Sequence, residues 1–301
     1  MRERLAAIAP EVDKSFLAPA LKVDLEYYYD AVNKINAAHL VMLMDQSLIS
    51  EQSAKVLAKA LIEMPSKELF KDELTLGQEE IYYAIESYLS GKLGSDVAGR
   101  LHLGRSRNDI YATASRMKVR DTYYELLQDI LELAARILAL AGLHCETVMT
   151  GYTHMQPAEP ITFGHYLVGI AEALERDFVR LEQAYNSLNI SPMGACALAG
   201  TSHNINRELV AELLGFDDLI ENSLDAIASR DYIVEVISCL SLVMITFSRF
   251  ASDLYIWATD EFSYIEFSDA IAASSSIMPQ KKNPIVLEHA KSKGAHVVGS
   301  L

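Results

Sequence analysis

Apolar residues recur at helical spacing along most of the chain, and strand-like alternation of apolar and polar positions is rare. The segments 24–45 and 79–90 place apolar side chains three or four residues apart, which predicts amphipathic helices. The segment 50–64 begins with Ser50, Glu51 and Gln52, a start typical of a capped helix, and a short helix is expected at 206–214. The pattern therefore predicts a chain built mainly of helices.

Three further apolar stretches are much longer than an ordinary helix of about 11–12 residues. They cover 108–146, which contains no proline, 162–188 and 223–259. They are too apolar for burial on one side only, so we expect other subunits to cover part of their surface. The predicted fold class is all-α: a bundle of long helices forms a domain at 105–301, and a smaller helical N-terminal domain precedes it at 1–104.

The last predicted helix begins near Pro284 and has no terminator before Leu301. We therefore expect the bundle domain to be incomplete and a small C-terminal domain to be absent. Loops are expected at the proline-containing turn before residue 162, in the Gly/Ala-rich segment 191–201 and in the polar segment 268–284. Residues 272–282 lack apolar periodicity, which predicts that this part of the loop is mobile without a ligand.

The apolar stretch 232–247 is the best candidate for a membrane span. It is interrupted by Glu235, it is followed by Arg249, and it is shorter than the roughly 20 residues that a span requires. We therefore interpret it as part of a helix buried in the bundle, with no contact to a membrane.

Composition and charge narrow the possible partners. Half of the 301 residues are hydrophobic and 22% are charged, which excludes a disordered chain. The net charge of −15 disfavours nucleic acid and anionic membranes, although a local group of cations can still bind a small anionic substrate. Three cysteines without paired spacing indicate reduced thiols in a cytoplasmic protein.

The first candidate for chemistry is the segment 104–109 (GRSRND), at the start of the first long helix. Two guanidinium groups, a hydroxyl and an amide at a helix N-terminus are suited to a carboxylate or a phosphate. A helix cap followed by a solvated basic turn explains the same residues equally well.

Two more clusters and one charged pair stand at the ends of long helices. His154 lies between Thr153 and Gln156 before the second helix, and its ordinary pKa suits proton transfer. The segment 275–284 (SSIMPQKKNP) precedes the last helix, and its Ile277 and Met278 are expected to anchor it through apolar contacts. Arg230 is expected on a buried helix, where Asp231 or Glu235 would neutralise it without any ligand.

The sequence contains no metal-ligand spacing, no nucleotide-phosphate loop and no nucleophile elbow. This pattern favours acid–base chemistry without a metal ion or a cofactor.

The order and spacing of SRND, GYTHMQ and SSIMPQKKNP resemble the fumarase/aspartase superfamily. The segments SPMGACALAGT, NRELVAELLGF and NSLDAIASRD are most similar to its argininosuccinate lyase group. This resemblance implies reversible elimination of fumarate from an N-substituted aspartate, with argininosuccinate as the substrate. The alternatives are the same elimination from a different N-substituted aspartate, and a catalytically inactive paralogue or fragment. The resemblance also implies a homotetramer whose active sites are shared between subunits.

The resemblance assigns roles to individual residues. Ser275, on a loop that closes over the substrate, would be the catalytic base, and His154 would be the acid, oriented by Glu288. Lys281 and Asn283 would hold a substrate carboxylate. The other residues implied to bind substrate are Ser106, Arg107, Asn108, Thr153, Gln156, Arg230 and Ser276.

Four positions depart from the pattern of the superfamily. Tyr82 stands where a histidine is usual, Ile110 replaces a glutamine, Ser274 replaces a glycine and Ile285 replaces an aspartate. These changes are expected to affect the pocket for the leaving amine more than the chemistry at the carboxylates. They leave the identity of the amine open.

Overall fold

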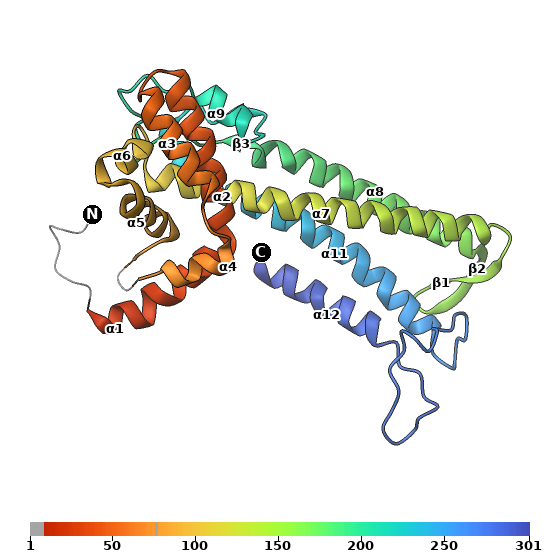
Figure 1. Cartoon of the computed structure of the whole chain (residues 1–301). Coiled ribbons are helices and arrows are strands. Elements are labelled where there is room, and N and C mark those ends of the chain that lie inside the picture. The colour runs from red at the N-terminus through yellow and green to blue at the C-terminus, as the bar shows by residue number, and fades with distance from the viewer. Residues whose placement is uncertain (1–8, 76–77) are drawn as a thin grey trace. The chain divides into compact units, whose positions relative to one another are not determined.

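The computed structural model describes residues 9–75 and 78–301, and it is built almost entirely of helices (Figure 1). The all-α prediction is therefore confirmed. The chain forms two compact units. The first unit comprises Met1–Thr122 and Leu188–Ser229, and the second comprises Tyr123–Ser187 and Arg230–Leu301. The division into domains at residue 104, predicted from the sequence, stays a prediction.

The first unit is a set of short and medium helices around one core. Its elements are α1 (Pro10–Val12), the π-helical turn η1 (Asp13–Leu17), α2 (Ala18–Asp45), α3 (Glu51–Ile62), α4 (Lys67–Phe70), η2 (Lys71–Glu73), α5 (Ile81–Leu93), α6 (Ser95–Gly99), η3 (Arg100–His102), the start of α7 (Arg107–Leu143), β3 (Ile190–Ser191), α9 (Arg207–Leu213), β4 (Asp218–Leu219) and α10 (Ser223–Ala228). The two short strands β3 and β4 pair in parallel.

Helical spacing explains how α2 organises this core. Its buried residues Leu25, Val32, Ile35 and Leu43 fall on one face and join a cluster with α3, α5 and the start of α7. The predicted cap of α3 is confirmed, because Ser50 Oγ accepts a hydrogen bond from the Ser53 amide at 3.2 Å.

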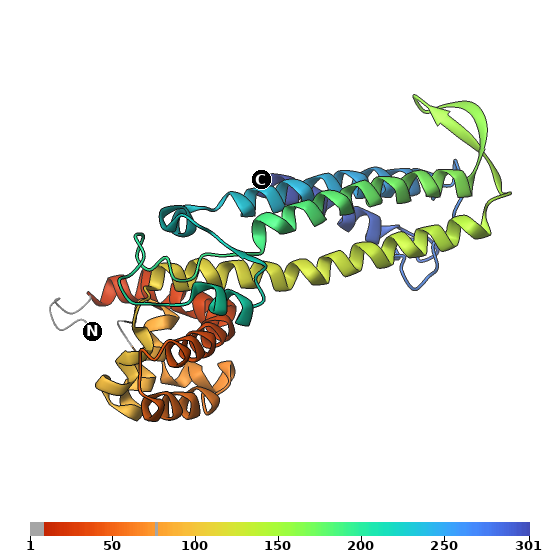
Figure 2. The ribbon, with the colours of Figure 1, turned by 90° about the horizontal axis from the view of Figure 1, so that it is seen from above.

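The second unit consists of long helices and one hairpin. It contains the rest of α7, the strands β1 (Val148–Thr153) and β2 (Gln156–Thr162), and the helices α8 (Phe163–Leu188), α11 (Asp231–Trp257) and α12 (Ile285–Ser300). Both views show α8 and α11 running alongside each other (Figures 1 and 2). Its core joins residues of α7 and α8 to Phe247 and Phe250 of α11.

A close approach between α7 and α8 depends on Gly164, at the start of α8. A Cβ atom at this position would lie 2.7 Å from the Ala141 carbonyl oxygen, so only glycine fits without a shift of the backbone. The last helix, α12, packs on α11, where Gly294 lies against Met244.

The long helices largely follow the sequence pattern. The structure confirms the first two as α7 and α8, within a few residues at each end. The stretch 223–259 is not one helix, because the chain breaks between α10 and α11 at Ser229 and Arg230. The turn expected before residue 162 is instead the antiparallel hairpin of β1 and β2, so that expectation was wrong.

Helix α11 is longer than the apolar stretch that the sequence analysis considered as a membrane span. It has 27 residues, so by length and composition it is able to cross a membrane, and the length argument from the sequence was wrong. Only 22% of its most apolar window is buried within the described chain. Val234, Leu242 and Ile245 of this helix are exposed, so its apolar surface extends beyond what one chain covers.

Candidate active site

The SRND segment is organised by the buried carboxylate of Asp109. Its oxygens accept hydrogen bonds from the backbone amides of Ser106 (2.9 Å), Gly194 (3.1 Å) and Cys196 (2.9 Å). Because these amides come from two segments, Asp109 fastens the 191–201 loop to the start of α7. Burial raises the pKa of Asp109 to about 6, although the three amides oppose this shift.

Gly194 is required at this junction. It has a φ of +86°, and a Cβ atom would lie 2.7 Å from Cγ of Arg207. A side chain at this position would therefore push the loop away from Asp109.

The three predicted binding residues of this segment lie together at the start of α7. Ser106 Oγ accepts a bond from the Asn108 amide at 3.4 Å, and Asn108 Nδ2 donates to the Ala197 carbonyl at 3.0 Å. Arg107 Nη1 forms ion pairs with Glu79 and Glu80, each at 3.4 Å. Within one chain, carboxylates of the protein itself occupy this guanidinium.

Two of the departures from the superfamily pattern are buried in the core of the first unit. Tyr82 is 3% exposed and Ile110 is fully buried. Tyr82 Oη forms a 2.6 Å hydrogen bond with Nδ1 of His102, and burial lowers the pKa of His102 to about 4. Within the chain, Tyr82 and Ile110 both belong to the hydrophobic core of the first unit.

The hairpin of the second unit places Thr153 and Gln156 as a strand pair, with His154 and Met155 in the turn between them. His154 and Met155 have φ values of 54° and 61°, the left-handed conformation that a two-residue hairpin turn of this kind requires at both positions. Asn-Gly is the usual pair there, so the turn holds two larger side chains under strain. All four side chains are exposed, and that of His154 makes no hydrogen bond with the residues that the structure describes.

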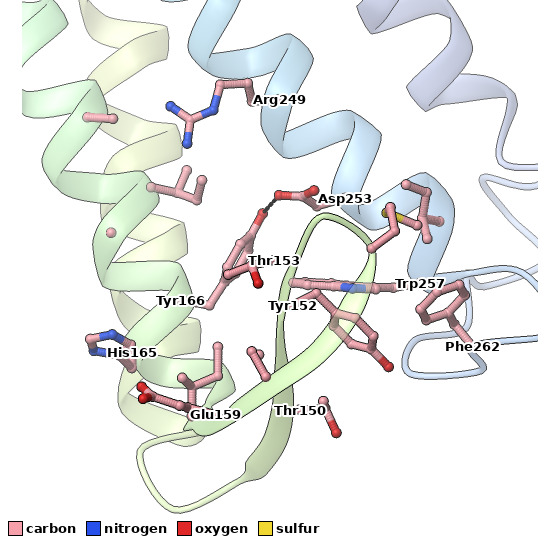
Figure 3. A pocket seen from close by; sticks show the side chains of 18 of the residues that line it. Thr150, Tyr152, Thr153, Glu159, His165, Tyr166, Arg249, Asp253, Trp257 and Phe262 are labelled. Atoms are coloured by element: carbon pink, nitrogen blue, oxygen red, sulfur yellow. Dashed lines mark hydrogen bonds between the residues drawn. The ribbon is translucent and has the colours of Figure 1, made fainter.

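A cleft of about 710 Å³ lies beside this hairpin, between β1, β2, α8 and α11 (Figure 3). Tyr166 Oη donates a hydrogen bond to Asp253 at 2.7 Å, and Trp257 packs against the Tyr166 ring. Burial, followed by the Asp253 carboxylate, raises the pKa of Tyr166 above its ordinary value. Among the predicted site residues, Thr153 lines this cleft.

The sequence analysis did not identify this cleft. Tyr166, Asp253 and Trp257 come from two helices whose spacing indicates core packing. Only the contact between these helices brings the three side chains together.

The loop that carries Ser275 is closed at its base. Ala273 and Asn283 exchange two backbone hydrogen bonds of 2.9 Å. Ser275 is half-buried, and its Oγ accepts long bonds from the amides of Ile277 (3.4 Å) and Met278 (3.3 Å). Ser276 and Lys281 are exposed.

Ile277 and Met278 do not anchor this loop as expected. Their side chains are 83% and 44% exposed. The loop is instead tied by Lys282, whose Nζ lies 2.6 Å from Glu266 and 2.7 Å from Asp269.

Glu288 and Arg230 occupy different surroundings from those expected. Glu288 Oε1 accepts a 3.4 Å hydrogen bond from Tyr255 and does not contact His154 within this chain. Arg230 directly precedes α11 and is exposed, so the expectation of a buried arginine was wrong. Three predicted site residues lie at the hairpin turn of the second unit: Thr153, His154 and Gln156. Among the described residues, no hydrogen bond or ion pair links them to the Ser275 loop or to Glu288.

Comparison with known proteins gives the class of protein that this fold and these clusters define. The model of a lyase family matches residues 22–299. The chain therefore belongs to this lyase family, and the resemblance to the fumarase/aspartase superfamily is confirmed.

Individual relatives indicate a narrower group within this family, the argininosuccinate lyases. The chain is 46% identical over 285 residues to argininosuccinate lyase 1 of Shouchella clausii, covering 94% of this chain and 57% of the relative. It is 43% identical over 275 residues to argininosuccinate lyase of Methanosarcina barkeri, covering 91% of this chain and 56% of the relative. The chain thus spans little more than half the length of these relatives.

A solved structure of EDDS lyase in complex with formate superimposes with a TM-score of 0.86 at 34% identity, over 98% of this chain and 58% of that one. A variant of EDDS lyase with bound fumarate matches equally well. Membership of this family indicates a soluble protein in which α11 is a bundle helix and not a membrane span.

Proposed function

We propose that the full-length protein is a carbon–nitrogen lyase that converts argininosuccinate into arginine and fumarate. One observation carries this proposal: the 46% identity to an argininosuccinate lyase over 94% of this chain, a span that holds SRND, THMQ and SSIMPQKKNP in their order. Because the chain spans 57% of that relative, the activity is proposed for the longer protein.

In the proposed reaction, Ser275 removes a proton from the carbon next to a substrate carboxylate. The electron pair passes into that carboxylate and gives a dianionic aci-carboxylate. The C–N bond then breaks, the double bond of fumarate forms, and His154 gives a proton to the leaving nitrogen. Fixed cations and hydrogen-bond donors that meet the developing charge supply the largest part of such catalysis.

The geometry of the loop supports Ser275 as the base. A serine hydroxyl is a poor base unless its alkoxide is stabilised. The amides of Ile277 and Met278 already point at Oγ, at 3.4 and 3.3 Å, and Lys281 lies six residues further along the same loop. Substrate binding would bring Lys281 and Asn283 to one carboxylate, with Ser276 beside them.

The remaining binding residues come from other elements. Ser106, Arg107 and Asn108 would bind substrate at the start of α7. Thr153, Gln156 and Arg230 would contact its carboxylates. A substrate anion at Arg107 would compete with Glu79 and Glu80, which now share its guanidinium.

The assembly we propose is a homotetramer in which each active site draws on three subunits. Its support is the exposed apolar surface of the long helices, which water would otherwise cover. The exposed residues are Leu131, Leu138 and Leu140 of α7, Val168 and Val179 of α8, and Val234, Leu242 and Ile245 of α11. Within such an assembly His154 would meet Glu288 from a different copy. We place the protein in the cytoplasm, without nucleic acid partners.

A second candidate is the same elimination from a different N-substituted aspartate. The departures at Tyr82, Ile110, Ser274 and Ile285 favour it, as does the 34% identity to EDDS lyase. An inactive paralogue or fragment is the third alternative.

The test is the ultraviolet absorbance of fumarate after separate addition of argininosuccinate, adenylosuccinate and aspartate to the full-length protein. We expect fumarate from argininosuccinate alone. Release from another substrate would support the second candidate. No release from any of the three, by a protein shown to be folded, would contradict the lyase proposal.

A further inference from the structure

The hairpin of β1 and β2 carries His154 but has little support of its own. It is a sheet of two strands, and an isolated two-stranded hairpin is at best marginally stable in water. Most of β2 is exposed, and the strand register shifts between Thr150 and Tyr152. The turn is strained, because His154 and Met155 both have positive φ values. Contacts from outside the hairpin must therefore fix the position of its turn.

Tyr152 connects the hairpin to a segment 112 residues further along the chain. Its ring lies 5.5 Å from the ring of Phe262, in an edge-to-face arrangement that Figure 3 shows. The Tyr152 and Tyr264 rings lie 6.4 Å apart, and their hydroxyls are hydrogen-bonded to each other at 2.9 Å. Aromatic pairs at these separations attract each other beyond the effect of the area that they bury. Tyr152 is thus held two positions before His154.

Phe262 and Tyr264 belong to the turn 258–264 that follows α11, which we call the clasp. The Tyr264 amide donates a hydrogen bond to the Trp257 carbonyl at the end of α11, at 3.0 Å. Trp257 is only 8% exposed, and its ring packs edge-to-face on Tyr166 of α8, with 4.6 Å between the ring centres. The clasp is therefore built on the packed ends of two long helices.

We propose that the clasp is a positioning element of the active site, in which Tyr264 and Phe262 fix the hairpin through Tyr152. The clasp thereby presents His154 to the substrate in one position, and it acts through the hairpin and not on the substrate itself. A displacement of about 1 Å in a reacting group can slow a reaction about 10²-fold. The hold on the hairpin follows from the second unit alone, whereas its effect on catalysis rests on the proposed function.

Hydrogen exchange tests the hold on the hairpin without any substrate. In the full-length protein, Tyr264→Ala should speed exchange at the amides of β1 and β2 about tenfold, while α3 in the first unit keeps the rates of the wild type. The control is Tyr27→Ala, which removes an exposed tyrosine of α2 and should leave exchange in the hairpin unchanged. Unchanged exchange in Tyr264→Ala overturns the proposal, whatever the protein catalyses.

Kinetics test the consequence for catalysis. For Tyr264→Ala we expect kcat with argininosuccinate to fall about tenfold to a hundredfold. Tyr264→Phe keeps the ring, so its kcat should fall only about twofold to threefold. The solvent deuterium isotope effect on kcat separates positioning from a loss of folded enzyme. It should rise in Tyr264→Ala, because proton transfer from a displaced His154 becomes slower, whereas a smaller folded fraction would leave it unchanged.

A double-mutant cycle tests the hydrogen bond between the two hydroxyls. Tyr152→Phe and Tyr264→Phe remove opposite ends of the same bond, so the two substitutions together should lower kcat no more than either does alone. Effects that multiply would mean that each hydroxyl acts separately, and would contradict the clasp.

The remaining outcomes separate the two claims. Faster exchange in the hairpin with an unchanged kcat and isotope effect would refute the positioning role. Should Tyr264→Ala fail to fold, the exchange rates and kinetics of Tyr264→Phe and Tyr152→Phe decide the proposal. If the wild-type protein releases no fumarate from argininosuccinate, the proposed function fails, and hydrogen exchange alone decides whether the clasp holds the hairpin.

Discussion

At the scale of single residues, the segment in front of α7 is held in part by a buried histidine, His39. His39 is 1% exposed, and its Nε2 donates to the Leu103 carbonyl. Burial, followed by the charge of Arg105, lowers the pKa of His39 to about 3. The neutral imidazole is therefore part of the native fold, and its protonation opposes folding.

This pKa gives a prediction about acid stability. Between pH 6.5 and pH 3 the unfolded chain binds a proton at His39 and the native chain does not, so the free energy of unfolding falls as the pH falls through this window. At about 1.36 kcal/mol per pH unit, the loss between pH 7 and pH 4 is about 3 kcal/mol. His39→Gln does not titrate, and its stability should vary less with pH by this amount.

The measurement is urea unfolding at several pH values. The exposed His203 provides the control, because His203→Gln should keep the pH dependence of the wild type. If His39→Gln and His203→Gln show the same slope, the buried imidazole is not the cause.

Ser275 is the residue on which the proposed chemistry depends most. Ser275→Ala removes the base and leaves the binding groups in place, so kcat should fall by about 10²–10⁴-fold with little change in substrate affinity. Lys281→Ala should lower both kcat and the affinity for substrate. The ammonium group of Lys281 would interact with the substrate carboxylate in the bound state and more strongly in the aci-carboxylate. Steady-state kinetics with argininosuccinate and binding of substrate to the inactive variant measure the two effects. Near-normal turnover by Ser275→Ala would transfer the role of the base to His154.

Some of these residues could be identified from the sequence and others could not. Ser106, His154 and Ser275 stand in polar motifs at helix ends, where local pattern is informative. Asp109 was treated only as part of a motif, because its three amide partners come from two segments that the fold brings together. The pair of Tyr166 and Asp253 lies 87 positions apart and carries no local signal.

At the scale of elements, periodicity predicted the long helices because their length averages over many residues. The hairpin of β1 and β2 escaped prediction because β2 contains Pro157 and Pro160, and because the turn contains His154 and Met155 in place of Asn-Gly. The break before α11 also lacks glycine and proline. It depends on Ser229 and Arg230, neither of which is a strong helix breaker.

The Ser275 loop gives a prediction at this scale. Lys282 joins Glu266 and Asp269 at the base of the loop, next to the bridge between Ala273 and Asn283. Ion pairs this exposed contribute only weakly to stability, so Lys282→Gln should speed hydrogen exchange at the two bridging amides about twofold to tenfold. The difference should shrink in high salt.

Lys281→Gln is the matched control for this measurement. Its side chain forms no ion pair within the described part of the chain, so the exchange of Ala273 and Asn283 should stay as in the wild type. Equal acceleration by both substitutions would show that the loop responds to total charge and not to the contact made by Lys282.

At the scale of the whole molecule, the question is how clusters on different elements form one site. His154 lies in the hairpin turn and Ser275 in the loop before α12, and within one copy no bond joins them among the described residues. The exposed apolar residues of α7, α8 and α11 supply a surface through which copies can associate. If subunits share sites, mixed oligomers of two inactive variants can contain active sites in which every segment is intact.

We therefore expect activity to return when His154→Asn and Ser275→Ala are mixed under conditions that exchange subunits. In an equal mixture, half of the hairpins and half of the loops are intact. A site that takes its hairpin from one copy and its loop from another therefore has both intact with a probability of about one quarter, so about a quarter of the activity should return.

The control is a mixture of Ser275→Ala with Lys281→Ala. These two defects lie in the same loop, every loop then carries one of them, and no activity should return. The measurement is fumarate release before and after exchange, with light scattering to follow the oligomer. Activity that stays at the level of the separate variants, in oligomers shown to have exchanged, would mean that His154 and Ser275 act within one chain.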